Sequence, residues 1–306
     1  MPADLMTWLW APITIFAAFT QTLRNAAQRH LTKELGTLGA TLVRFLYGLP
    51  FAIAWLAVVA LAGSHVPEPN GPFLIWVTAG AAGQIFATAL LLRAMEERNF
   101  AIGVAYSKTE IIQVAVFSIV LLGDPLSLAA ALAILIGSIG VTLLSPQIDK
   151  MNLAAFAKGW TTPAALFGIA SGSCFAISAV GYRGAALSVG AENAFIAAAY
   201  TLVWAQALQT LALGGWIAWR NMRTIHAVIR AWRWSLAAGA CGAFASAGWF
   251  TAMTLEPAAH VRTLGLVEVL FSYLISLRLF RERLSALEIT GLALLVLGVA
   301  LITLRA

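Results

Sequence analysis

Ten apolar runs, each long enough to cross a lipid bilayer, fill almost the whole chain. They lie near residues 8–31, 36–62, 73–95, 100–122, 126–145, 162–187, 192–219, 234–255, 259–280 and 285–304. A crossing needs roughly 20 predominantly apolar residues, so a chain of 306 residues has room for these spans and short connections only. Only 10% of the residues are charged, whereas soluble domains carry about 25%. We therefore predict an all-α, multi-pass membrane protein with ten transmembrane helices.

The second half of the chain repeats the first. Residues 76–145 align with 234–303 at a constant offset of 158, with 17 identities in 70 positions, where this composition would give roughly one in ten by chance. The matched pairs include Glu110 with Glu268 and Gly140 with Gly298. The repeat unit is five spans, which divides the chain into domains at 1–147 and 148–306. An odd number of spans inverts the second copy, and such repeats are common in secondary transporters with a substrate site between the halves.

The basic residues gather in the connections on one side of the predicted bundle. The net charge is +6, and we attribute it to loops that face anionic lipid and not to nucleic-acid binding. The positive-inside rule places this side in the cytoplasm and both termini outside. The connection 220–233 is either an amphipathic helix on the inner leaflet or the ends of spans 7 and 8. The basic side comprises Arg29, Lys33, Arg93, Arg98, Lys150, Lys158, Arg220, Arg223, Arg230, Arg233, Arg281 and Arg283.

Two related segments stand at equivalent places in the two repeats. They are TEIIQVAVFSIVLLGDPLS, which contains Glu110, and LVEVLFSYLISLRLFRERLS, which contains Glu268. Both resemble the EamA-type members of the drug/metabolite transporter superfamily. The proline that follows the family's glutamate is replaced by Ile111 and Val269, which removes the usual cause of a helix kink there. The resemblance implies export or exchange of small metabolites, often amino acids, by alternating access without ATP. It also implies cytoplasmic termini, contrary to the charge count, and a location in the bacterial inner membrane.

Polar residues on span 1 are spaced for one helical face. Gln21, Arg24, Asn25 and Gln28 follow the i, i+3, i+4, i+7 pattern. A charged side chain at the centre of a span costs on the order of 2.5 to 3.5 kcal/mol, so this stripe is expected to line a central cavity. The alternative is that Arg24 and Gln28 lie near the cytoplasmic end and extend to the interface.

Span 4 carries a second polar face, formed by Tyr106, Glu110 and Gln113, while Lys108 points away from it. Glu110 and its repeat mate Glu268 are the candidates for proton coupling, because a desolvated carboxylate can take up or release a proton as its access to water changes. The alternative is a structural role, such as pairing with Arg44, Lys108 or Arg262.

The candidate substrate site combines these charged residues with aromatic side chains that could stack on a ligand or simply pack. The charged candidates include more cations than carboxylates: Arg24, Arg44, Lys108 and Arg262 against Glu110 and Glu268. This excess of positive charge favours a substrate that bears a carboxylate. The substrate-binding candidates are Gln21, Arg24, Asn25, Gln28, Arg44, Tyr106, Glu110, Gln113, Tyr182, Trp204, Trp249, Arg262 and Glu268.

The sequence contains no enzyme motif, no cofactor motif and no His or Cys spacing typical of a metal site. Spans 5 and 10 are nearly uncharged and carry Gly137, Gly140, Gly291 and Gly298, which indicates a supporting seam or a homodimer contact. We therefore predict a secondary exporter or exchanger of amino acids or related carboxylate-bearing metabolites. The alternatives are an organic-cation or drug exporter, a channel, or a scaffold or sensor that does not transport.

Overall fold

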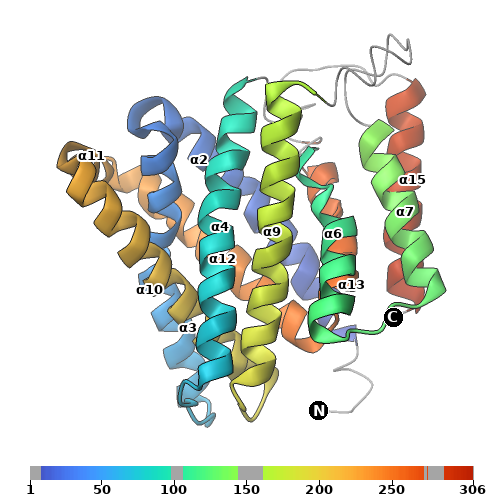
Figure 1. The fold of residues 1–306 in the computed structure, drawn as a ribbon, viewed down its shortest axis with the longest axis horizontal. Helices are drawn as coiled ribbons and strands as arrows, with labels where there is room; N and C mark the ends of the chain where they lie inside the picture. Colours follow the sequence, from blue (N-terminus) through green and yellow to red (C-terminus); the bar gives the residue numbers. More distant parts are fainter. Residues whose placement is uncertain (1–7, 98–105, 144–160, 272–273, 275–285, 306) are drawn as a thin grey trace.

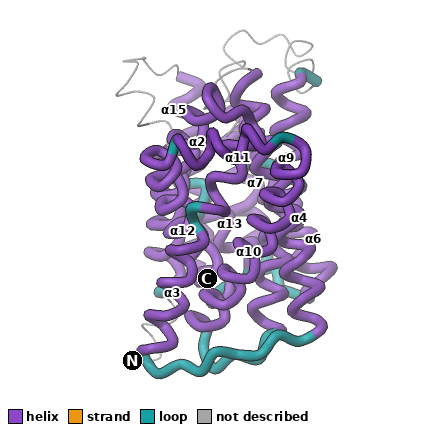
Figure 2. Tube along the Cα trace, turned by 90° about the vertical axis from the view of Figure 1, so that its left-hand side faces the viewer, coloured by secondary structure: helices purple, strands orange, loops and turns teal. Residues whose placement is uncertain are grey.

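The computed structural model describes residues 8–97, 106–143, 161–271, 274 and 286–305. Helices account for nearly all of them, and the described part of the chain contains no strand. Figure 1 shows these helices running side by side in one bundle, and Figure 2 shows the described loops that connect them.

Each of the ten predicted spans contains a helix. Five helical stretches, Trp10–Leu61, Gly71–Glu97, Pro163–Ser188, Ala194–Arg220 and Trp232–Leu255, are long and apolar enough to cross a membrane by themselves, and the first covers two predicted spans. The elements are α2 Trp10–Leu46, α3 Leu49–Leu61, α4 Gly71–Glu97, α6 Glu110–Phe117, the π-helix η1 Ser118–Leu122, α7 Leu128–Leu143, α9 Pro163–Ser188, α10 Ala194–Arg220, α11 Met222–Arg230, α12 Trp232–Leu255, α13 Ala258–Leu264 and α15 Ala286–Arg305.

Spans 1 and 2 follow each other without a loop. Helix α2 bends at Gly36, whose φ of 67° and ψ of 171° are accessible to glycine and strained for other residues. The side chain of Gln28 crosses the bend, and its Nε2 donates to the carbonyl oxygen of Ala40 at 2.8 Å. A second interruption at Tyr47–Gly48 precedes α3, which starts with Pro50 in its first turn.

Each main packed pair of the bundle joins a helix of the first repeat to a helix of the second. Helix α2 packs along α12, α4 along α9, and α7 along α15. Helix α4 ends at the end of the bundle where α12, its repeat mate, begins, so the two copies run in opposite directions (Figure 1). The proposed boundary between residues 147 and 148 lies outside the described residues.

The glycines of spans 5 and 10 face each other within one chain. A Cβ atom at Gly140 would lie 2.5 Å from the backbone nitrogen of Leu295, and one at Gly298 would lie 2.8 Å from the backbone nitrogen of Gly137. The glycine faces of α7 and α15 are therefore buried against each other, as expected for a supporting seam.

Spans 4 and 9 are both interrupted at the same point of the repeat. A turn at Lys108–Thr109 precedes α6, and a turn at Gly265–Leu266 follows α13. Tighter hydrogen bonds from residue i+3 to residue i replace the α-helical pattern here, such as Ile111 N to Lys108 O at 3.3 Å. The breaks form although neither segment has a proline after its glutamate. They place Glu110 in the first turn of α6 and Glu268 two residues beyond the equivalent turn.

The bend at Gly36, the end of α4 and helix α11 lie at one end of the bundle, which we call the basic end (Figure 1). The connection 220–233 forms a separate helix, α11, bounded by Asn221 and Ala231. Helix α2 begins and α15 ends toward the opposite end (Figure 1). The orientation of the termini in the membrane stays a prediction, and some of the residues behind it, Arg98, Lys150, Lys158, Arg281 and Arg283, lie outside the described residues.

Candidate functional site

Two ion pairs cross between the broken spans 4 and 9. Lys108 pairs with Glu268, and Arg262 pairs with Glu110. All four side chains are buried. Each span therefore contributes one cation and one carboxylate, and each carboxylate follows the break in its own helix.

Glu268 is surrounded by donors. In addition to Lys108, Gln21 Nε2 donates to its Oε2 at 2.7 Å and Asn25 Nδ2 donates to its Oε1 at 2.9 Å. Trp249 Nε1 donates to Gln21 Oε1 at 2.9 Å, which fixes the orientation of that amide. The polar stripe of span 1 thus meets the carboxylate of span 9.

Arg24 and Arg44 differ from the other two cations because neither contacts a carboxylate in the described part of the chain. Arg24 Nη2 donates to Asn25 Oδ1 at 2.6 Å, and Arg24 Nη1 has no partner among the described residues. Arg44 Nη1 donates to Thr88 Oγ1 at 2.9 Å. Both side chains are about 98% buried, with exposed fractions of 1% and 2%. Both side chains pack against Gly242 of α12. A Cβ atom at Gly242 would lie 3.2 Å from Arg24 Cδ and 3.4 Å from Arg44 Cγ.

A small cavity of about 20 Å³ lies among charged, polar and aromatic side chains of the cluster. Arg44 and Arg262 line it together with Gln21, and Tyr182, Trp249 and Phe250 form its apolar side. Its size suits about one water molecule. In the described conformation this cavity therefore has no room for a metabolite.

Two glutamines extend the polar region beside Tyr182. The tyrosine hydroxyl donates to Gln84 Oε1 at 3.1 Å, and Gln209 Nε2 donates to Tyr182 Oη at 2.8 Å. The Tyr182 ring stacks on Phe250 with a centroid distance of 4.2 Å. Helices α4, α9, α10 and α12 thus meet at this side of the cavity.

A further ion pair lies at the end of the bundle opposite the basic end. Arg183 of α9 binds both carboxylate oxygens of Asp124, with Nε to Oδ2 and Nη2 to Oδ1 both at 2.9 Å. Its Nη1 donates to the carbonyl oxygens of Met253 at 2.5 Å and Glu256 at 2.9 Å. One side chain therefore joins the connection after span 4 to the end of span 8.

Both repeats match one family model, the EamA-like transporter family, over residues 8–145 and 162–304. The chain belongs to the EamA-like transporter family. It is thus a multi-pass integral membrane transporter of the drug/metabolite type, as the resemblance predicted.

The fold of this EamA-like transporter is also found among solved structures. One crystal structure, whose title reads only "Crystal structure of protein", superposes with a TM-score of 0.66 at 19% identity, over 97% of this chain and 96% of that one. At this identity the likeness concerns the fold alone. No curated protein matches the sequence.

The structure brings together most of the predicted site residues of this EamA-like transporter. Gln21, Arg24, Asn25, Arg44, Glu110, Tyr182, Trp249, Arg262 and Glu268 lie in or beside the central cluster. The expectation that Arg24 and Gln28 could extend to the membrane interface is wrong, because both are 1% exposed and their polar groups bind inside the protein.

Four predicted residues lie away from the cavity. Gln28 spans the α2 bend, Tyr106 lies against Gly168 of α9, and Trp204 packs edge-on against Phe73 with a centroid distance of 5.9 Å. Gln113 is half-buried on α6 and is absent from the cavity wall.

Gln84 and Gln209 were not predicted as site residues. Their position as polar amides within otherwise apolar spans is a signal in the sequence that could have identified them. Lys108, which the helical spacing separated from Glu110, indeed serves a different partner, Glu268. Arg183 was not among the predicted site residues, and it makes a buried pair with Asp124.

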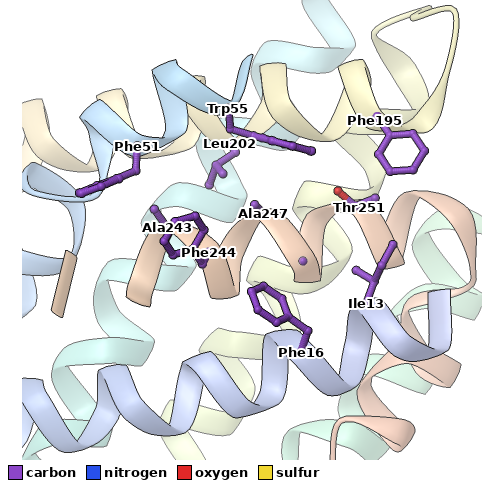
Figure 3. A pocket seen from close by; sticks show the side chains of 11 residues that line it. Ile13, Phe16, Phe51, Trp55, Phe195, Leu202, Ala243, Phe244, Ala247 and Thr251 are labelled. Carbon is purple, nitrogen blue, oxygen red and sulfur yellow. The ribbon is translucent and has the colours of Figure 1, made fainter. Parts of the chain in front are cut away.

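A second hollow, of about 300 Å³, lies between α2, α3, α10 and α12. Figure 3 shows that its wall is almost entirely apolar, with Phe16, Trp55 and Phe195 pointing into it and Thr251 as a single hydroxyl. The residues of α12 that line this hollow differ from those that line the central cavity. An ionic substrate has no counter-charge there, so the central cluster is the candidate transport site.

Proposed function

We propose that this transporter is a secondary carrier that exports or exchanges amino acids or related carboxylate-bearing metabolites by alternating access. The observation that supports this substrate class is the pair Arg24 and Arg44, two buried arginines without a carboxylate partner in the described residues.

Burying an unpaired charge costs several kcal/mol unless another charge or a set of hydrogen bonds compensates it. The cluster contains four buried cations, Arg24, Arg44, Lys108 and Arg262, against two buried carboxylates, Glu110 and Glu268. A substrate carboxylate would offset this excess of positive charge. Arginine is suited to the task because its guanidinium group binds a carboxylate with two parallel hydrogen bonds.

An organic cation is a weaker candidate, because the aromatic faces that could bind it are occupied. The guanidinium group of Arg262 lies over the Trp249 ring at 4.5 Å from its centroid, and Tyr182 stacks on Phe250. A cationic substrate would have to displace Arg262 from Trp249 and enter a region that is already positively charged.

The size of the cavity supports a mechanism with a conformational change. A cavity of about 20 Å³ is too small for an amino acid, so substrate entry requires the helices around it to separate. We infer that the Arg183–Asp124 ion pair is a gate at one end of the path, which alternating access would open and close in turn with the other end.

Glu110 and Glu268 are the proposed proton-coupling residues. Protonation of Glu268 would remove the counter-charge of Lys108, and protonation of Glu110 would remove that of Arg262. A proton on either glutamate would leave a cation free to bind the substrate carboxylate, so proton and substrate would move together. Export would then be driven by the outward gradient of the substrate or by exchange.

Counterflow in proteoliposomes tests the proposal, with labelled amino acids, organic acids and quaternary amines offered separately. We expect carboxylate-bearing compounds to move, and Arg44→Gln to raise KM about tenfold or more by removing a charged hydrogen-bond donor. Arg233→Gln is the matched control, because Arg233 is exposed at the basic end and lies over Trp232.

Three other outcomes would replace the proposal. Movement of quaternary amines that Arg44→Gln leaves unchanged would indicate the organic-cation exporter. Loss of folding in every cluster variant, without flux of any compound in the wild type, would indicate a scaffold or sensor. Unitary currents in planar bilayers would indicate a channel.

We place the protein in the bacterial inner membrane, with the basic end toward the cytoplasm under the positive-inside rule. A homodimer through spans 5 and 10 stays a prediction. Because the glycines of α7 and α15 face each other within one chain, such a dimer would use the outward side chains, for example Leu132, Leu135 and Ile139.

A further inference from the structure

A groove of about 630 Å³ lies at the basic end, away from the transport site. The bend of α2 at Gly36, the last turns of α4 and the junction of α10 with α11 enclose it. These segments meet at the same end of the bundle (Figure 1). The groove exists because spans 1 and 2 turn sharply at Gly36 while α11 packs beside Gly39 through Thr224.

The groove is apolar along its floor and polar at its rim. Leu38, Phe86, Leu90 and Trp216 form much of the floor. The rim carries Arg93, Arg220, Asn221 and Thr224. A phospholipid has the same division, with an anionic phosphate at the membrane surface and acyl chains directed inward.

The charges of the rim favour an anion. Arg93 is partly compensated, because its Nη1 lies 2.9 Å from Glu96 Oε2 and its Nη2 lies 3.8 Å from Glu97 Oε1. Arg220 contacts no carboxylate in the described residues and lies over the ring of Trp219, at 5.8 Å from its centroid. The side chain of Asn221 makes no capping hydrogen bond to α11, so its amide is available to a ligand.

Exposed tryptophans indicate the depth of the groove in the bilayer. Trp216, Trp219, Trp232 and Trp234 are 45%, 79%, 53% and 57% exposed, and all lie on the turns of α10 and α12 next to α11. Tryptophan is enriched where membrane and water meet. The rim therefore lies at headgroup level, and the floor extends toward the acyl chains.

We propose that this groove is a binding site for an anionic phospholipid, whose phosphate contacts Arg220 and Asn221 and whose acyl chain lies along Leu38, Phe86, Leu90 and Trp216. The site is separate from the substrate cluster and is independent of the function proposed above. Basic pockets between transmembrane helices bind anionic headgroups in this manner.

Thermal unfolding of the purified protein in a non-ionic detergent tests the site, with phosphatidylglycerol, phosphatidylcholine and inorganic phosphate each titrated in turn. We expect phosphatidylglycerol to raise Tm in a saturable manner, because it binds the folded state. Phosphatidylcholine should have a much smaller effect, and inorganic phosphate alone should have none because it lacks the acyl chain.

Two variants localise the binding. Arg220→Gln should require about fivefold more phosphatidylglycerol for half the shift in Tm, since each basic residue near an anionic headgroup contributes a modest electrostatic attraction. Ala89→Phe, which places a ring in the groove beside Leu90, should reduce the maximal shift. Arg233→Gln, with an exposed arginine outside the groove at the same end, is the control and should leave the titration unchanged.

Several results would overturn the site. Equal shifts with phosphatidylcholine would remove the role of the anionic headgroup, and a shift with inorganic phosphate alone would indicate an anion site without a lipid. Equal losses in Arg220→Gln and Arg233→Gln would show general attraction to the basic end and no defined groove.

Discussion

Arg183 and Asp124 join the two repeats at the end of the bundle opposite the basic end, with the guanidinium group of one bridging both carboxylate oxygens of the other. Their side chains are 10% and 9% exposed, so the pair is largely desolvated. Arg183 also holds the last carbonyls of α12. The contact thus links spans 4, 6 and 8 and is suited to close one entrance.

We predict that Asp124→Asn opens this end. Removing one partner of a buried pair leaves the other charge uncompensated, which should lower the free energy of unfolding by about 3 kcal/mol. A cysteine placed at Ser178, on the cavity wall, should then react faster with a thiol reagent in a background without Cys174 and Cys241. Glu192→Gln, an exposed acid at the same end, should change neither quantity. An unchanged labelling rate in Asp124→Asn would show that the pair does not close the path.

The two glutamates should differ in their effect on stability. Glu268 accepts from Lys108, Gln21 and Asn25, whereas Glu110 pairs with Arg262 alone among the described residues. We expect Glu268→Gln to destabilise the protein by about 3 to 5 kcal/mol and Glu110→Gln by less, as measured by denaturant unfolding in detergent.

A double replacement separates stability from transport. Lys108→Met with Glu268→Leu removes both charges, so it should recover much of the stability lost in Glu268→Gln. If Glu268 couples transport to protons, this variant should fold and carry no proton-driven flux. Proton-driven flux at the wild-type rate would exclude Glu268 from the coupling step.

Glycine-to-alanine replacements should have opposite effects in two environments. At Gly140 and Gly298 the new Cβ would lie within 3 Å of backbone atoms of the facing helix, so each should cost about 1 to 3 kcal/mol by overpacking. At Gly215 of α10 nothing lies within 4 Å, and alanine should stabilise the helix by about 0.5 to 1 kcal/mol. Unfolding in detergent measures all three, and a stabilised Gly140→Ala would contradict the close packing of α7 on α15.

Gly36→Ala isolates the cost of backbone conformation. No atom lies within 4 Å of the position of a Cβ there, so any loss of stability comes from the positive φ angle alone. We expect about 1 to 3 kcal/mol and a changed rate of transport, measured by counterflow, because spans 1 and 2 meet at this residue. Wild-type stability would show that the chain can relax the bend.

Much of the fold was predictable because its signals are local. The apolar runs predicted all ten spans, and the offset of 158 identified α12 as the repeat mate of α4 and α15 as that of α7. The spacing of Gln21, Arg24 and Asn25 likewise placed them on one face of span 1, where the structure has them.

The partners of these residues were not predictable from one sequence, because they lie far apart along the chain. Lys108 and Glu268 are separated by 160 residues. The spacing of residues along each span did not decide which of Arg44, Lys108 and Arg262 pairs with each glutamate. The breaks in spans 4 and 9 also lacked a local signal, since no proline marks them. At the second break the ring of Trp249 lies against Gly265, where a larger residue would collide with it.

The absence of a loop at Gly36 limits how spans 1 and 2 can move. Since the dihedral angles of about one residue separate them, a rotation of span 1 must reorient span 2 instead of being absorbed by slack chain. Length changes are equally restricted, because an extra residue at this point would rotate every following side chain of α2 by about 100° about the helix axis and turn Arg44 away from Thr88 and the cavity. We therefore expect probes or fused domains to be better tolerated in the largely exposed connection at 62–70 than at Gly36.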